Sequence, residues 1–212
     1  EGKIIQPKAK PGDVKFVDYN GDGQINASDQ QYCGNPFPKL NMGLTLTGVY
    51  KGIDLNLFFD GNFGNKVFNS MRYSTSYMQN GITNVSADVL NEWREDNRNT
   101  TMPRYTANDE NQNNQAITDR WLENGSFFRL KTLELGYTFP SVWTDKIKFQ
   151  KIRIYTAMEN LFMATKYKGY NPDLGVNTSS VANQDDMVMA RGCDPGRYPT
   201  PRTFTFGLQV NF

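Results

Sequence analysis

The stretch Thr203-Phe204-Thr205-Phe206-Gly207-Leu208-Gln209-Val210-Asn211-Phe212 alternates between polar and apolar side chains without interruption. Successive side chains of a β-strand face opposite sides, so this pattern predicts a strand with one apolar and one polar face. About ten residues are enough for a tilted strand to cross a bilayer, whereas a strand in a soluble core more often has about five or six. The stretch is therefore typical either of a half-buried soluble strand or of an outer-membrane barrel wall.

The composition of the whole chain favours a barrel over a compact soluble domain. Hydrophobic residues make up only 38% of the 212 residues, yet aromatic residues reach 13%. Barrel strands place half of their residues on a polar face, and long polar loops dilute the average further. The chain has no run of about 18 apolar residues, which excludes a transmembrane helix but not transmembrane strands. The net charge of the chain is only +1, so its composition does not indicate a nucleic-acid-binding protein.

The reactive residue types limit the chemistry that the chain can perform. Histidine, the commonest general base and transition-metal ligand, is absent. Together with the lack of a nucleophile motif or a paired-carboxylate constellation, this predicts that the chain is not an enzyme. Cys33 and Cys193 lie far apart in sequence and either form one disulfide in an oxidising compartment or stay isolated. The opening residues 1–3 are not those of a signal peptide, which indicates a mature or internal start.

An acidic loop follows a basic N-terminal segment whose apolar end, residues 14–17, predicts a short strand. Residues 18–29 match the calcium-loop pattern except that the last acid is Asp rather than Glu. No amphipathic helix flanks the loop, which excludes a standard EF-hand sensor. The loop either holds calcium, or another hard cation, in a structural role, or is a tight loop held by Asx turns without an ion. The expected ligands are Asp18, Asn20, Asp22, Gln24, Asn26 and Asp29.

Four further segments show strand alternation. Residues 42–47 and 53–60 predict a hairpin in which Gly52 is available for positive φ. Alternation resumes over residues 127–139, where Pro140 ends it, and again over residues 152–159. The chain therefore has five long strands in all. Single aromatic residues lie near the strand ends, as in the aromatic girdles of membrane barrels.

Long polar segments connect most of these strands, and one of them predicts a helix from Ser86 to Arg94 with Ser86 as its N-cap. If the last strand ends on the periplasmic side, the short links at 51–52 and 140–149 fall on that side too. All long segments then fall outside, which is the arrangement of bacterial outer-membrane barrels. The long segments are 1–41, 61–126 and 163–202.

The predicted fold class is all-β, a transmembrane β-barrel segment of about five strands with long extracellular loops. Barrel closure takes roughly eight strands, and an open sheet would leave unpaired backbone groups in hydrocarbon. We therefore expect the chain to be part of something larger. Residues 1–41 are interpreted as an extracellular loop segment with the calcium-type loop 18–29, and residues 42–212 as C-terminal barrel strands with extracellular loops.

Six stretches occur in a characteristic order and spacing: GDVKFVDYNGDG (12–23), YKGIDL (50–55), NGSFFRLK (124–131), ENLF (159–162), YKGYNPD (167–173) and YPTPRTFTFGL (198–208). With them the chain closely resembles, over nearly its whole length, the C-terminal portion of SusC/RagA-type TonB-dependent outer-membrane receptors. The resemblance implies a barrel of about 22 strands filled by an N-terminal plug. It also implies a SusD-like surface lipoprotein acting as a hinged lid, and TonB-powered import of glycans or peptides across the outer membrane of a Gram-negative bacterium. The signal peptide, the TonB-contacting segment and the plug would lie outside this chain.

The resemblance also implies roles for individual residues. The terminal strand would close the barrel against its first strand and meet outer-membrane lipid, through Phe204, Phe206, Leu208, Val210 and Phe212. Charged side chains on the polar rows would line the lumen and form a network with the plug rather than contact substrate; they are Asp54, Asp60, Glu134, Arg153 and Glu159.

Loop tyrosines are candidates for stacking on sugar rings, since a pyranose face offers apolar C–H groups to an aromatic ring. The competing and stronger expectation for each is packing within the loops or contact with the lid. The candidates are Tyr73, Tyr77, Tyr105, Tyr167 and Tyr170.

One alternative class accounts for part of the pattern. A soluble, calcium-stabilised β-sandwich that binds carbohydrate would explain the 18–29 loop and the aromatic residues equally well. It would not explain why the strands are long, or why all short links fall on one side of the predicted membrane and all long segments on the other.

Overall fold

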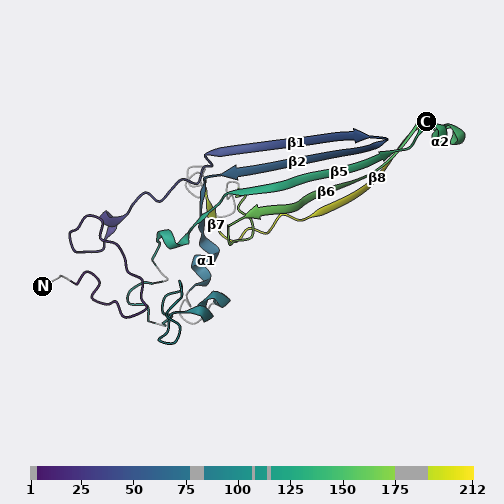
Figure 1. Cartoon of the computed structure of the whole chain (residues 1–212). Helices are drawn as coiled ribbons and strands as arrows, with labels where there is room; N and C mark the ends of the chain where they lie inside the picture. Colours follow the sequence, from purple (N-terminus) through teal and green to yellow (C-terminus); the bar gives the residue numbers. More distant parts are fainter. Residues whose placement is uncertain (1–3, 77–83, 107, 114–115, 175–190) are drawn as a thin grey trace, which may run out of the picture. The chain divides into compact units, whose positions relative to one another are not determined.

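The computed structural model describes residues 4–76, 84–106, 108–113, 116–174 and 191–212. Its main feature is an antiparallel sheet of five strands in the order β1-β2-β5-β6-β8 (Figure 1). The bounds are Leu40–Tyr50 for β1, Ile53–Phe63 for β2, Phe127–Thr138 for β5, Lys151–Thr165 for β6 and Thr203–Asn211 for β8. The five long strands predicted from the alternation are confirmed.

The other described elements are short. Within the described residues, no helix is both long and apolar enough to cross a membrane. The short strands are β3 (Lys66–Asn69), β4 (Leu122–Asn124) and β7 (Cys193–Asp194). The helices are η1 (Ala27–Asp29), α1 (Ser70–Thr75), η2 (Ala87–Asn91), η3 (Asp119–Trp121), α2 (Ser141–Thr144) and η4 (Asp145–Ile147).

The chain forms two units. The sheet unit comprises Asn35–Val67, Asn124–Gly192 and Arg197–Phe212, and the loop unit comprises Glu1–Gly34, Phe68–Glu123 and Cys193–Gly196. In the loop unit, β3 and β7 pair in parallel. The hydrophobic residues buried in this unit are Val89, Met102 and Trp121.

The register of the large sheet gathers the apolar rows of all five strands on one face. Leu57 of β2, for example, lies between Leu46 of β1 and Leu133 of β5. This face is open: Phe206 is 79% exposed and Leu208 64% exposed. A soluble sandwich would cover such a row with a second sheet, so the exposure argues against the sandwich alternative and is typical of a lipid-facing wall.

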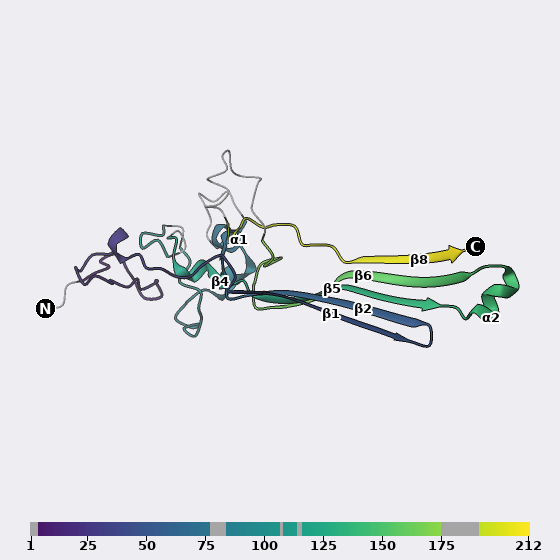
Figure 2. The same ribbon diagram turned by 90° about the horizontal axis from the view of Figure 1, so that it is seen from above.

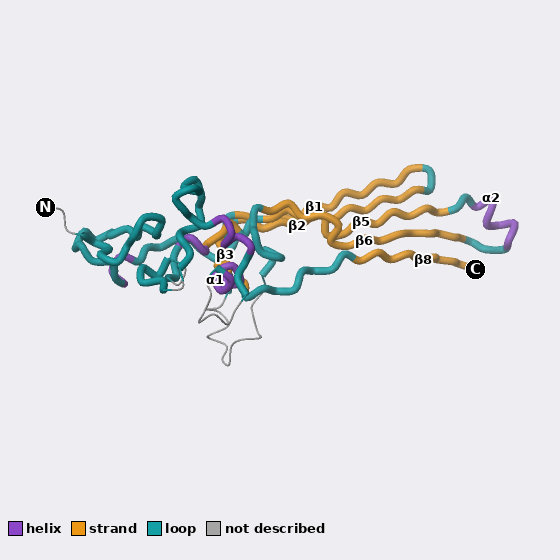
Figure 3. The backbone as a smooth tube through the Cα atoms, turned by 90° about the horizontal axis from the view of Figure 1, so that it is seen from below, coloured by secondary structure: helices purple, strands orange, loops and turns teal. Residues whose placement is uncertain are grey.

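The two short links lie at the same end of the sheet, as the views from the side and from above agree (Figures 1 and 2). Lys51 (φ 47°) and Gly52 (φ 84°) both adopt positive φ, as a two-residue type I′ hairpin turn requires, which confirms the expected reversal at Gly52. The β5–β6 link contains α2 and η4 (Figure 3). Thr138 N, at the end of β5, donates to Gly52 O at 2.7 Å and so joins the hairpin turn to β5.

Two local expectations need correction. Residues 14–17 form no strand, because side-chain amides accept from the backbone donors that a neighbouring strand would have paired. Val14 N donates to Asn113 Oδ1 at 2.7 Å, and Phe16 N donates to Gln6 Oε1 at 2.8 Å. The helix after Ser86 is a short 3-10 helix, Ala87–Asn91. Ser86 caps it as expected, but the extended backbone of Glu92 (ψ 157°) ends it before Arg94.

A charge placed on the apolar face tests the lipid-facing orientation of the sheet. Leu57→Arg in the complete polypeptide that carries this chain is expected to destabilise the folded state by about 2–4 kcal/mol, the cost of Arg near a bilayer midplane. The matched control is Asn56→Arg on the opposite face, which we expect to fold normally. The measurement is the fraction of heat-modifiable, folded protein in isolated membranes. Equal folding of the two variants would contradict this orientation.

Candidate functional site: charged clusters on the polar face

Arg153 of β6 is the centre of the first charged cluster on the polar face of the sheet. Its guanidinium pairs with Asp54 through Nε–Oδ1 at 3.0 Å and through a second, shorter contact from Nη2 to Oδ2. Nη2 also donates to Glu134 Oε1 at 2.6 Å, and Nη1 to Gln209 Oε1 at 3.3 Å. The side chain of Arg153 is only 13% exposed. One cation therefore joins strands β2, β5, β6 and β8 across the sheet.

A glycine leaves the space in which the Arg153–Asp54 ion pair forms. Gly136 lies between Asp54 and Tyr155 in the register, and a Cβ added to it would lie within 2.6 Å of Arg153 Nε and Asp54 Oδ1. Any larger residue would displace the ion pair. The guanidinium also lies 5.0 Å from the ring centroid of Tyr155, in cation–π range. The absence of a side chain at Gly136 is thus what allows Arg153 to reach Asp54.

Arg129 of β5 is the centre of the second cluster. It forms a two-point pair with Asp60, through Nε–Oδ1 at 2.9 Å and Nη2–Oδ2 at 2.6 Å, and a further contact with Asp173 Oδ2 at 3.0 Å. Arg129 is 5% exposed. Asp173 belongs to the segment that follows β6, and Asn171 in the same segment donates to Thr200 Oγ1 at 2.9 Å. This cluster therefore fixes the segment after β6 to the strand wall.

The structure pairs most of the predicted lumen charges within the strand wall, and their network with a plug stays a prediction. Four of the five predicted charges belong to the two arginine-centred clusters, whereas Glu159 lies on the same face opposite Thr203 and is exposed. Asp54, Asp60 and Glu134 thus have arginine partners within the wall itself. Sequence reasoning missed Arg129 and Asp173. Arg129 lies directly across from Asp60 on the neighbouring strand, but this pairing can be predicted only once the register of the two strands is known.

The candidate stacking tyrosines differ in how much ring they expose. Tyr167 is 6% exposed, whereas Tyr170 is 64% exposed. Tyr73 packs edge-on against Trp121, with ring centroids 5.6 Å apart. Tyr105 is half-buried, and the described residues offer its hydroxyl no hydrogen-bond partner. Tyr77 lies outside the described residues. Ligand stacking by these residues stays a prediction, and Tyr170 is the most exposed of the four candidates that the structure describes.

Trp121 is the centre of the loop unit. It is fully buried, and its Nε1 donates to Ala116 O at 3.0 Å. Two guanidinium groups lie near its ring, that of Arg120 at 4.6 Å and that of Arg72 at 5.8 Å from the centroid. Burial, with a smaller contribution from Arg72, lowers the pKa of Arg120 to about 10. These contacts indicate self-packing of the loop unit around one indole.

The 18–29 loop has the shape of a closed acidic turn. Asp18 accepts from Gly21 N at 2.7 Å and from Gly23 N at 2.8 Å, and Asp22 accepts from Gln24 N at 2.8 Å. Asp29 accepts from Tyr19 N at 2.9 Å, and with Asn26 it forms a capping box on η1. Among the described residues, no group of three or more His, Cys, Asp or Glu side chains is arranged to hold a metal ion. Calcium binding stays a prediction.

Both cysteines are free thiols. Cys33 is exposed and Cys193 is half-buried in β7, so the disulfide left open by the sequence is not formed. Burial raises the pKa of the Cys193 thiol, which makes it less reactive at neutral pH.

A sheet of long strands with one exposed apolar face and one polar face carrying paired charges defines a wall segment of a transmembrane β-barrel. Comparison with known proteins supports the same class. No family model matches the chain. TonB-dependent receptor P3 of Formosa agariphila is 34% identical over 202 residues, which cover 95% of this chain and 19% of that receptor. TonB-dependent receptor SusC of Bacteroides thetaiotaomicron is 27% identical over 218 residues, which cover 99% and 19%.

Solved structures give the same result. The RagAB peptide transporter matches with a TM-score of 0.70 and 27% identity over 95% of this chain and 20% of that one. The RagAB peptide importer in its closed-closed state matches with a TM-score of 0.69 and 27% identity over 93% and 20%. The chain is thus a relative of the SusC/RagA-type TonB-dependent receptors, and the resemblance found in its sequence is confirmed. It spans about a fifth of the length of the relatives it matches.

The Arg153 cluster can be tested by a double-mutant cycle. In the complete receptor, Arg153→Gln is expected to cost about 1–3 kcal/mol, because it leaves Asp54 and Glu134 as neighbouring unpaired carboxylates. Asp54→Asn in the same background should recover part of that loss. Arg202→Gln, at an exposed arginine, is the matched control. The readout is the denaturant midpoint of the membrane-embedded protein, and strictly additive effects would disprove the coupling.

The calcium prediction can be tested by luminescence, because Tyr19 lies within the loop and can transfer energy to bound Tb³⁺. We expect binding in the range of extracellular calcium modules, about 10⁻⁴–10⁻³ M, with calcium competing for the site. Asp18→Asn should weaken it about tenfold or more, while Asp96→Asn, an exposed acid elsewhere, should not. An identical titration for wild type and Asp18→Asn would contradict calcium binding at this loop.

Proposed function

We propose that this chain is the C-terminal portion of a TonB-dependent outer-membrane transporter of the SusC/RagA type. In this role it contributes five wall strands and extracellular loops to a larger barrel, and performs no catalysis. Similarity over 95% of the chain to the RagAB peptide transporter, with a TM-score of 0.70, is the observation that carries the proposal. The apolar face meets outer-membrane lipid, and the polar face lines the lumen.

The transported material in this proposal is a glycan or a peptide, and the transporter works with a SusD-like surface lipoprotein. The similarity to a peptide transporter supports the peptide part of this range, and the glycan part rests on the resemblance of the sequence to SusC/RagA-type receptors. Energy comes through TonB, which contacts a part of the receptor outside this chain. The internally paired arginines support a structural role for the lumen charges, because their carboxylate partners already neutralise them.

The experiment is isolation of the native complex. Outer membranes of the source bacterium are extracted in mild detergent, and the assembly is captured with an antibody to the exposed 18–29 loop and analysed by mass spectrometry. We expect a receptor about five times the length of this chain, together with a lipoprotein. Deleting the gene should abolish growth on one glycan or peptide source, and reintroducing the intact gene should restore it.

A complementing gene that lacks residues 203–212 is the matched control for the growth experiment. It removes β8, so the barrel should not assemble and growth should stay lost. Recovery of the chain as a monodisperse soluble species of about 24 kDa without detergent would overturn the proposal and return the calcium-stabilised binding module to consideration.

A further inference from the structure

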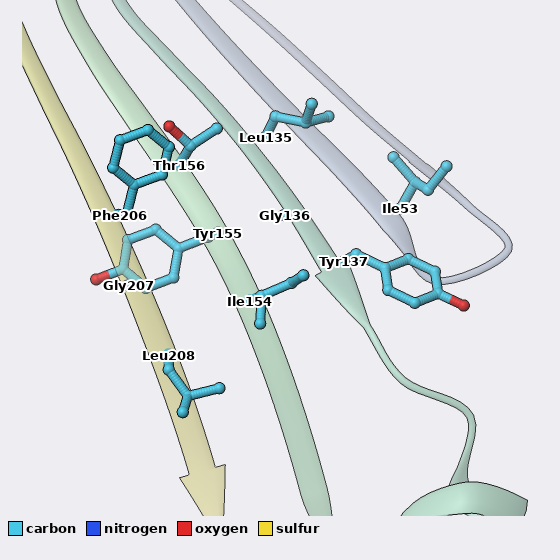
Figure 4. Close-up of a pocket in the computed structure, with 10 residues that line it drawn as sticks. All are labelled: Ile53, Leu135, Gly136, Tyr137, Ile154, Tyr155, Thr156, Phe206, Gly207 and Leu208. Carbon is cyan, nitrogen blue, oxygen red and sulfur yellow. The ribbon is translucent and has the colours of Figure 1, made fainter.

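An apolar hollow lies on the face of the sheet that the proposed function turns toward lipid. Its volume is about 740 Å³, within the range of small-molecule sites. Side chains of four strands contribute to it (Figure 4). The apolar side chains among them are those of Ile53, Leu135, Tyr137, Ile154, Phe206 and Leu208.

The chemistry of the hollow favours a hydrocarbon chain. Its hydroxyl groups on the apolar row belong to Tyr137 and to Thr156, and the Oγ1 of Thr156 is buried and has no hydrogen-bond partner among the described residues. No charged side chain lines the hollow. A polar ligand would therefore find few groups to bind there, whereas an acyl chain can fill the hollow through van der Waals contacts with its apolar side chains.

Three cations lie at the end of the sheet next to the hollow. Ile53, which lines the hollow, directly follows the turn that contains Lys51, and Lys146 and Lys148 belong to the β5–β6 link at the same end. All three are exposed. Within the described part of the chain, no ion pair holds any of them. The only acid in these two links is Asp145, so the end of the sheet carries a net positive charge.

Aromatic residues lie along the chain from the hollow toward the two lysines of the β5–β6 link. The rings of Tyr137 and Phe139 are 5.1 Å apart, and those of Phe139 and Trp143 are 6.3 Å apart. Trp143 is 58% exposed. Such rings favour the headgroup level of a membrane. Along β5 and the link after it, the order from hollow to aromatic residues to lysines is the order of tail, interface and phosphate in a membrane lipid.

We propose that the hollow, together with Lys51, Lys146 and Lys148, binds an anionic glycerophospholipid from the membrane leaflet at the short-link end of the barrel. One acyl chain fills the hollow, and the lysines hold the headgroup phosphate. The inference rests on the proposed function, since it requires the apolar face to lie in a bilayer. Charge complementarity favours an anionic lipid over a zwitterionic one.

The test uses the complete receptor, purified in mild detergent and titrated with phosphatidylglycerol or phosphatidylethanolamine of identical acyl chains under native mass spectrometry. Wild type should bind phosphatidylglycerol about tenfold more tightly or better. Each of Lys51→Gln, Lys146→Gln and Lys148→Gln should weaken phosphatidylglycerol about fivefold. Thr156→Phe, which fills the hollow, should weaken both lipids by the same factor.

Lys151→Gln is the matched control, because the register places Lys151 on the polar face with Arg153. It should leave both affinities unchanged. Equal affinity of wild type for the two lipids, or an effect of Lys151→Gln as large as that of Lys146→Gln, would overturn the lipid site. If either result is obtained with a receptor that still fractionates with the outer membrane, only the lipid site is disproved and the proposed function is unaffected. If the protein is instead soluble without detergent, the proposed function itself is disproved.

Discussion

Backbone hydrogen bonding in hydrocarbon is the constraint on which this sheet depends. A strand in lipid must pair every N–H and C=O group with a neighbouring strand, because no water is available. β2, β5 and β6 each have a strand on both sides, whereas β1 and β8 have a described neighbour on only one side. Each outer strand therefore exposes a row of unpaired backbone groups that a further strand must cover. The sheet is a complete structure only as an arc of a larger closed wall.

The polar face shows how such an arc remains ordered along the lumen. Arg153 and Arg129 each bring together two carboxylates, and each lies largely buried beneath other side chains. A guanidinium can satisfy two carboxylates at once because its donors form a rigid planar fork. Cross-strand pairs of this kind stabilise neighbouring strands beyond their ladder hydrogen bonds. Removing either arginine would leave like charges facing one another.

The sequence alone predicted the strands well because side-chain alternation reports directly on the two faces of a sheet. The hairpin at Gly52, the end of β5 before Pro140 and the shared sidedness of the short links all follow from local rules. Residues 14–17 also contain alternating apolar side chains, yet Asn113 and Gln6 accept from the backbone N–H groups of Val14 and Phe16. The bond from Val14 to Asn113 joins residues 99 positions apart, and no periodicity of the sequence predicts such a contact. The two arginine clusters could not be predicted for the same reason, because their partners are also far apart in sequence.

The irregularity in β5 has a consequence for how the strand tolerates changes in length. Phe58 pairs with Thr132, but the next residue, Phe59, pairs with Leu130, so Lys131 has no counterpart in β2. Side-chain parity is therefore inverted across Lys131, and this inversion turns Arg129 toward Asp60 instead of toward lipid. Loss of Lys131 would preserve the pairing of both halves of β5 with β2. Loss of a residue elsewhere in β5 would turn one half of the strand inside out.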